Sequence, residues 1–188
     1  MPNWTFNTIT INGNKQDIAK MLNDAVKNDE GKTTFSSWFP VPETYNKYDT
    51  TNHPNGNRLV VGERYHDGLG NEGIVTEELL AEYKQATKEQ KEKYGAVGWY
   101  DYNCKYFGCK WNCEIEIEEH SDESITLRTD TPWCDPDVFL SRLSERYPNL
   151  SIHNHADFEE GHWWDKSYFE GEETIDGYGE DRWDDEDE

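Results

Sequence analysis

The sequence is poor in apolar and in basic residues, and it contains no long hydrophobic run. Apolar residues make up 34% of the chain, and 18 Lys and Arg stand against 40 Asp and Glu. A membrane-spanning helix needs about 18 or more consecutive apolar residues, and the chain has no such run. The opening residues Met1–Trp4 lack the basic start and the apolar core of a secretory signal. We therefore expect a cytoplasmic protein.

Cysteines are few, and catalytic motifs are missing. Without a secretory signal, the four cysteines are expected to be free thiols. The sequence holds no G-x-S-x-G, no phosphate-binding loop and no H-E-x-x-H. A literal G-x-G-x-x-G at residues 68–73 does not follow a convincing strand, so we interpret it as a loop. The sequence thus predicts neither an enzyme nor a cofactor.

The net charge of −22 restricts the kind of partner. It disfavours direct binding to a nucleic-acid backbone, which requires Lys and Arg to neutralise phosphates. It is compatible with a surface that occupies a basic, nucleic-acid-binding groove on another protein, or with a role in solubility alone. Residues 157–188 hold 15 acidic and two basic residues, and we expect their end, DDEDE, to be disordered.

Hydrophobic periodicity predicts an α+β fold. Strands are expected at residues 4–12, 114–119, 124–129 and 150–158, and helices at 15–28, 76–93 and 136–147. A shorter strand-like piece lies at 58–61. Without an insertion at about 43–98, which contains the second helix, the order is β-α-β-β-α-β. That order is typical of the ferredoxin-like sandwich, with two helices on one face of an antiparallel sheet. We expect this domain at 1–165 and an acidic extension at 166–188.

Side-chain alternation assigns faces to these strands. Ile115 and Ile117 are expected to face the core, with the glutamates between them outward. In the last strand, His153 and His155 lie opposite the apolar positions. On the first helix, Val26 falls on the predicted buried stripe.

The stretch Trp99–Cys113 is the densest in aromatic residues and cysteines. We expect its aromatic side chains to pin the insertion onto the sandwich: Trp99, Tyr100, Phe107 and Trp111. Its cysteines are spaced C-x4-C-x3-C, and Cys134 or His120 would complete a four-ligand zinc site. The favoured interpretation is that these cysteines are small core residues.

Three blocks of the chain resemble YubB-type ferredoxin-like proteins of phages and plasmids. They are Pro2-Asn3-Trp4 with Asn7, then Trp99-Tyr100-Asp101 with 107–112, and Thr131-Pro132-Trp133. Phe107 stands where that family has a Trp, and Cys109 where it has a Thr. The resemblance covers residues 1–165 and implies a mobile-element protein made inside bacteria. It implies no activity.

These observations lead to a hypothesis about function. We expect a non-enzymatic protein that binds and inhibits a host nucleic-acid-handling protein, as a DNA mimic of the anti-CRISPR or anti-restriction type would. One alternative is an accessory domain whose acidity serves solubility, and another is a metalloprotein or enzyme that uses His153, His155 and Asp157. The acidic residues expected to contact the partner are Glu114, Glu116, Glu118, Glu159, Glu160, Glu172, Glu173, Asp176, Asp181, Asp184 and Asp185.

Overall fold

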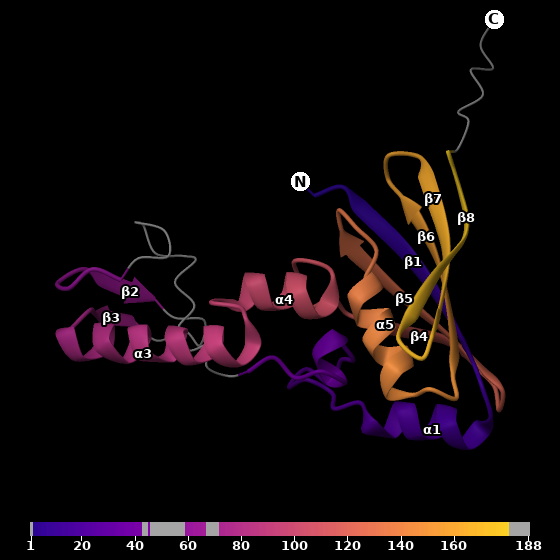
Figure 1. Cartoon of the computed structure of the whole chain (residues 1–188), viewed down its shortest axis with the longest axis horizontal. Coiled ribbons are helices and arrows are strands. Elements are labelled where there is room, and N and C mark those ends of the chain that lie inside the picture. The colour runs from indigo at the N-terminus through magenta and orange to yellow at the C-terminus, as the bar shows by residue number, and fades with distance from the viewer. Residues whose placement is uncertain (1, 43–44, 46–58, 67–71, 181–188) are drawn as a thin grey trace, which may run out of the picture. The chain divides into compact units, whose positions relative to one another are not determined.

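The chain is an α+β protein built around a large antiparallel sheet (Figure 1). The computed structural model describes residues 2–42, 45, 59–66 and 72–180. The chain divides into two compact units. The first comprises Met1–Pro40 and Tyr106–Glu188, and the second comprises Val41–Lys105. In the part of the chain that the structure describes, no helix has the length and apolarity needed to cross a membrane.

The first unit contains a sheet of six antiparallel strands in the order β4-β5-β1-β6-β7-β8. Thr8 of β1 lies opposite Arg128 of β5 on one side and His155 of β6 on the other. This register fixes which side chains share a face. The strands are β1 (Trp4–Asn12), β4 (Glu116–His120), β5 (Ser124–Pro132), β6 (Ser151–Phe158), β7 (His162–Phe169) and β8 (Glu172–Glu180).

Two α-helices and a short 3-10 helix pack on one face of this sheet: α1 (Lys15–Asp24), α5 (Asp137–Arg146) and η1 (Phe35–Ser37). The alternation in β1 and β5 places Ile9 and Leu127 in this core, fully buried. Phe35 of η1 stacks on Phe139 of α5 with ring centroids 4.4 Å apart. The expected buried stripe of α5 is confirmed.

A polar network also lies on the core face. The Asn7 amide donates to the Thr129 carbonyl oxygen at 3.1 Å and to Thr131 Oγ1 at 2.9 Å. Asn154 Nδ2 in turn donates to Asn7 Oδ1 at 3.1 Å. The apparent break in the apolar pattern of β6 at Asn154 is therefore a partnered buried residue.

The second unit contains β2 (Arg64–His66), β3 (Glu72–Ile74) and α3 (Glu77–Tyr94), and nearly all of α4 (Trp99–Phe107). Thr76 Oγ1 accepts from Leu79 N at 3.1 Å and begins α3 as predicted. Gly95 ends α3 with a φ of 66°. Tyr45 and Tyr102 pack with Tyr94 to form an aromatic cluster in this unit.

The region expected as an acidic extension instead continues the sheet. Residues 162–169 form β7, which pairs with β6, and residues 172–180 form β8, which pairs with β7 (Figure 1). A boundary at residue 165 would fall inside β7. Glu170 and Gly171 join the two strands with φ values of 50° and 87°, the positive pair of a two-residue hairpin turn. The expected disordered end, DDEDE at residues 184–188, lies outside the described residues.

Several local predictions need correction. Helix α1 was expected to reach residue 28, but it ends at Asp24, since Ala25 is extended and Val26 N donates to the Ser37 carbonyl oxygen at 3.0 Å. Val26 was expected to be buried, but it is 71% exposed. Residues 59–61 are not a strand. Ile117 is 50% exposed because β4 is an edge strand with an irregular register between Ile117 and Glu119. The glycine motif at 68–73 lies largely outside the described residues.

Candidate functional site

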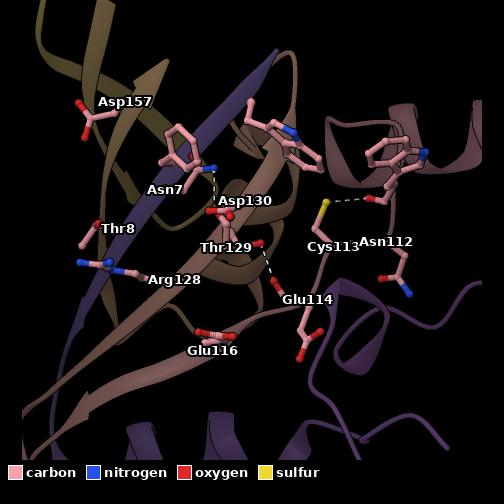
Figure 2. A pocket seen from close by; sticks show the side chains of 13 residues that line it. Asn7, Thr8, Asn112, Cys113, Glu114, Glu116, Arg128, Thr129, Asp130 and Asp157 are labelled. Atoms are coloured by element: carbon pink, nitrogen blue, oxygen red, sulfur yellow. Dashed lines mark hydrogen bonds between the residues drawn. The ribbon is translucent and has the colours of Figure 1, made fainter. Parts of the chain in front are cut away.

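A pocket of about 720 Å³ opens on the sheet face that turns away from α1 and α5 (Figure 2). We call this the open face, and we define it by Phe6, Thr8, His155 and Asp165. All residues that line the pocket belong to the first unit. They come from β1, β4, β5, β6 and the segment before β4: Trp4, Phe6, Asn7, Thr8, Trp111, Asn112, Cys113, Glu114, Glu116, Arg128, Thr129, Asp130 and Asp157.

Phe6 occupies a central position between two carboxylates. It pairs with Asp130 on β5 and with Asp157 on β6. Directly opposed residues place their Cβ atoms about 5 Å apart on the same face, so an acidic side chain flanks the ring on each side. Phe6 is 47% exposed, although it is a large apolar residue. Within the described residues, Asp130 has no ion-pair partner.

Indole rings form one end of the pocket. The ring centroids of Trp4 and Trp111 lie 5.6 Å apart, and those of Trp111 and Trp133 lie 6.1 Å apart. Lys110 Nζ lies 5.5 Å from the centroids of both Trp111 and Trp133, within the range of a cation–π contact. Trp111 is half-buried and lines the pocket.

The four aromatic residues expected to pin the insertion do not behave as one group. Phe107 is the one that is fully buried, where it packs with Phe35 at 5.7 Å. Phe107 and Trp111 belong to the first unit, and Trp99 and Tyr100 belong to the second. Residues 99–107 form a helix that the sequence analysis did not predict.

Side-chain hydrogen bonds hold the segment before β4 in place. Asn112 Oδ1 accepts from the Ser36 backbone N–H at 2.8 Å, and Asn112 Nδ2 donates to Ser36 Oγ at 2.9 Å. Thr129 Oγ1 donates to the Glu114 carbonyl oxygen at 2.7 Å, as Figure 2 shows. The pocket wall is therefore fixed to η1 on one side and to β5 on the other.

Ion pairs engage some of the charges at the pocket. Lys32 Nζ lies 2.7 Å from Glu114 Oε2, and Arg128 Nε lies 2.9 Å from Glu118 Oε2. Arg128 is the single basic residue among the lining residues. Glu116 has no ion-pair partner among the described residues. The pocket thus retains a negative balance after its own ion pairs are formed.

Histidines extend the open face beside the pocket. His155 Nδ1 lies 2.7 Å from Asp165 Oδ1, and its Nε2 lies 3.2 Å from Asp157 Oδ1. The hydrogen bond with Asp165 raises the pKa of His155 above its ordinary value, against the opposing effect of burial. His153 lies 3.6 Å from both Asp165 and Asp176.

These histidines are the residues that the sequence offered as metal ligands. His153, His155 and Asp157 share the open face, as their alternation predicted. Their imidazoles contact carboxylates of β6, β7 and β8. Across the described ranges, no three or more His, Cys, Asp or Glu side chains are arranged to hold a metal ion.

All four cysteines lie in the described residues and none forms a disulfide, and Cys113 lines the pocket. Cys109 and Cys113 are buried, and their Sγ atoms lie 3.2 and 3.6 Å from the Trp111 carbonyl oxygen. A hydrogen bond with Cys113, together with burial, raises the pKa of the Cys109 thiol. A thiol held protonated in this way is a poor nucleophile, which agrees with a packing role.

The acidic residues expected to bind a partner fall into three places. Glu114, Glu116 and Glu118 lie at the β4 edge, while Glu172, Glu173 and Asp176 lie on β8 at the opposite edge. At the end of β6, Glu159 Oε2 accepts from Trp4 N at 2.8 Å, and the Asn3 amide donates to Glu160. Asp181, Asp184 and Asp185 lie outside the described residues.

Sequence reasoning missed the pocket itself. It did not select Phe6 or Asp130, it considered Trp111 only as an aromatic residue that pins the insertion, and it considered Asp157 only as a metal ligand. The alternation in β1 was sufficient to place Trp4 and Phe6 on the open face. No local signal pairs Phe6 with Asp130 and Asp157, because that pairing depends on the register of three strands.

The sequence matches no family model and no curated protein. Among solved structures, the chain is similar to a protein api92 from Yersinia pseudotuberculosis, described with the family model DUF1281. The two chains share 11% sequence identity at a TM-score of 0.49, over 96% of this chain and 98% of the other. A likeness at this level carries no inference about function.

Proposed function

We propose that the chain is a non-enzymatic binding protein whose acidic surface engages a basic, nucleic-acid-binding groove of another protein. The observation that carries this proposal is the pocket on the open face, where Phe6 lies between Asp130 and Asp157. Aromatic and carboxylate groups together suit a cationic partner surface. The net charge of −22 supplies long-range attraction to such a surface.

We also infer a ferredoxin-like core. The chain order β1, α1, β4, β5, α5, β6 and the sheet order β4-β5-β1-β6 support it. In this interpretation β7 and β8 extend the sheet at the β6 side. The resemblance to YubB-type proteins remains a prediction. It would place the chain in the cytoplasm of a bacterium that hosts a phage or plasmid, where a DNA-mimic inhibitor would act on defence enzymes.

Affinity capture followed by reconstitution tests this proposal. The purified chain is used as bait in a bacterial lysate, and the captured protein is then purified and mixed with the chain. We expect a nucleic-acid-binding protein, competition by duplex DNA or RNA, and an affinity that falls steeply between about 50 and about 300 mM salt. Capture of no such protein, or a complex insensitive to both competitor and salt, would contradict the proposal.

A truncation tests whether the acidic residues after β8 contribute to partner binding in addition to the surface of the sheet. Removal of residues 181–188 takes away six acidic residues and one arginine but leaves β8 intact. If acidity serves solubility alone, this truncation will not change affinity for the reconstituted partner. If the acidic end contributes to the proposed surface, affinity will fall, most strongly at low salt.

A further inference from the structure

We infer that the pocket on the open face binds the guanidinium group of an arginine side chain presented by a partner protein. This inference rests on the proposed function, because it assigns a ligand class to the same surface. It goes further in naming one cationic group and the three side chains that receive it: Phe6, Asp130 and Asp157.

The spacing of these side chains suits a planar cation. The Cβ atoms of Asp130 and Asp157 each lie about 5 Å from that of Phe6, so the two carboxylates lie on opposite sides of the ring. A guanidinium stacks flat on an aromatic ring and carries five N–H donors in a fixed plane. Stacked on Phe6, it can donate toward Asp130 on one side and Asp157 on the other.

The charge balance of the pocket favours a cation over other ligands. Glu116, Asp130 and Asp157 line it, and of these Asp157 has one oxygen 3.2 Å from His155 Nε2. Arg128, the one basic residue of the lining, is paired with Glu118 at 2.9 Å. An anionic group would meet these carboxylates without a free counter-charge. A lysine ammonium would satisfy the charge, but it is a compact point donor that cannot bridge both carboxylates from one stacked position.

The size of the pocket and its aromatic wall favour a side chain on a peptide over a free ion. A volume of about 720 Å³ lies in the range of pockets that hold a sizeable ligand. Trp4 and Trp111 line one end and offer apolar surface to residues that flank the arginine. Lys110 Nζ lies 5.5 Å from the centroid of the Trp111 ring, so this indole already accepts a cation from within the chain.

The test compares two dye-labelled peptides of equal length and charge, hexa-arginine and hexa-lysine, by fluorescence polarisation with the full chain. We expect hexa-arginine to bind at least about fivefold more tightly, which corresponds to about 1 kcal/mol. Phe6→Leu keeps an apolar side chain but removes the ring, and should abolish this preference. Two-dimensional NMR should place the largest shifts for hexa-arginine at Phe6, Asp130 and Asp157.

A pair of charge-matched variants separates the pocket from the general acidity. D130N/D157N removes two carboxylates from the pocket, and E123Q/E145Q removes two exposed carboxylates from elsewhere in the first unit. We expect the pocket variant to lose about tenfold or more in affinity for hexa-arginine, and the control less than about twofold. Thermal unfolding verifies that each variant is folded.

The outcomes distinguish this inference from the proposed function. If both peptides bind equally and both double variants lose affinity equally, the arginine pocket is overturned, while the wider acidic surface stands. If neither peptide binds at low salt, both are overturned. If hexa-arginine is preferred and the preference depends on Phe6 and the pocket carboxylates, the inference holds whatever protein affinity capture identifies.

Discussion

Lys166 Nζ lies 2.9 Å from Asp135 Oδ2 on the core face of the sheet, where the two side chains are only 10% and 12% exposed. Glu173 lies 3.4 Å from the same ammonium. Burial lowers the pKa of Lys166, but its hydrogen bond with Asp135 and the nearby carboxylates outweigh burial and raise the pKa above its ordinary value. A charged pair inside the core therefore connects β7 to the segment that precedes α5.

Removal of one partner of this pair should be costly. Lys166→Met keeps the apolar stem but leaves Asp135 buried without its cation. A buried charge without a partner typically destabilises a protein by about 3 to 5 kcal/mol, and we expect a loss of that size in chemical denaturation.

Two further variants test the explanation. Lys15 and Asp122 form an exposed pair at 3.0 Å, and Lys15→Met should leave stability nearly unchanged. Lys166→Met combined with Asp135→Leu removes both charges and should recover much of the loss. A single Lys166→Met variant as stable as the parent would mean that the pair is not formed in solution.

The contact between His155 and Asp165 predicts a pH-dependent stability. The folded-state pKa of His155 is raised, so protonated His155 stabilises the fold. This contribution is fully present below the unfolded pKa of about 6.5 and is lost as the pH rises through the folded value. The stability difference between the parent and His155→Gln should therefore shrink from pH 5 to pH 8.

A neighbouring substitution provides the control for this prediction. Asp165→Asn removes the hydrogen-bonded carboxylate and should lower the pKa of His155, as measured by NMR titration of the imidazole. An unchanged midpoint in Asp165→Asn would show that the contact does not set the pKa.

The elements predicted correctly from the sequence are those in which apolar residues follow one clear period, either that of a strand or that of a helix. In β1 and β5, apolar side chains alternate with polar ones, and in α5 Phe139, Leu140 and Leu143 mark one helical face. Strands β7 and β8 were missed because β8 buries little and charges occupy both faces of β7, where Asp165 faces out and Lys166 faces in. In a sequence pattern, a lysine such as Lys166 predicts an exposed position, because its buried partner Asp135 is distant in the sequence.

The candidate site was less predictable than the fold. Alternation assigns His155 and Phe6 to a face, but it does not say which strands neighbour β1. The pocket depends on β5 and β6 pairing on either side of β1, which brings Asp130 and Asp157 beside Phe6. That information is non-local and is not contained in any single stretch of sequence.

Asn7 and Thr8 are neighbours on opposite faces of β1. We therefore expect substitutions at the two positions to change the stability of the fold by different amounts. Asn7→Leu would leave the buried Asn154 amide without its acceptor, whereas Thr131 Oγ1 would keep its hydrogen bond to the Cys134 carbonyl oxygen. An orphaned buried group costs about 1 to 3 kcal/mol, so we expect a loss of at least that size in urea denaturation. Thr8→Val, on the open face, should change stability by less than about 0.5 kcal/mol. Equal effects at both positions would contradict the assigned register.

Trp163 lies against β8 at Gly179, where a side chain would not fit. A Cβ atom at Gly179 would come within 2.7 Å of Trp163 Nε1, and Gly177 allows a similar approach of the ring at 3.2 Å. The φ of Gly179 does not lie in the left-handed region, so alanine would cause no backbone strain there. Gly179→Ala should therefore destabilise the protein through the displaced ring, by roughly 1 to 3 kcal/mol.

A double-mutant cycle isolates this contact. With Trp163→Ala the obstacle is gone, and Gly179→Ala should become neutral or stabilising by about 0.5 to 1 kcal/mol, because alanine loses less backbone entropy than glycine on folding. The effect of Gly179→Ala on the free energy of unfolding should therefore differ in sign or size between the parent and Trp163→Ala. Chemical denaturation measures this effect, with tryptophan fluorescence as a second readout. Purely additive effects would mean that the indole does not lie over β8.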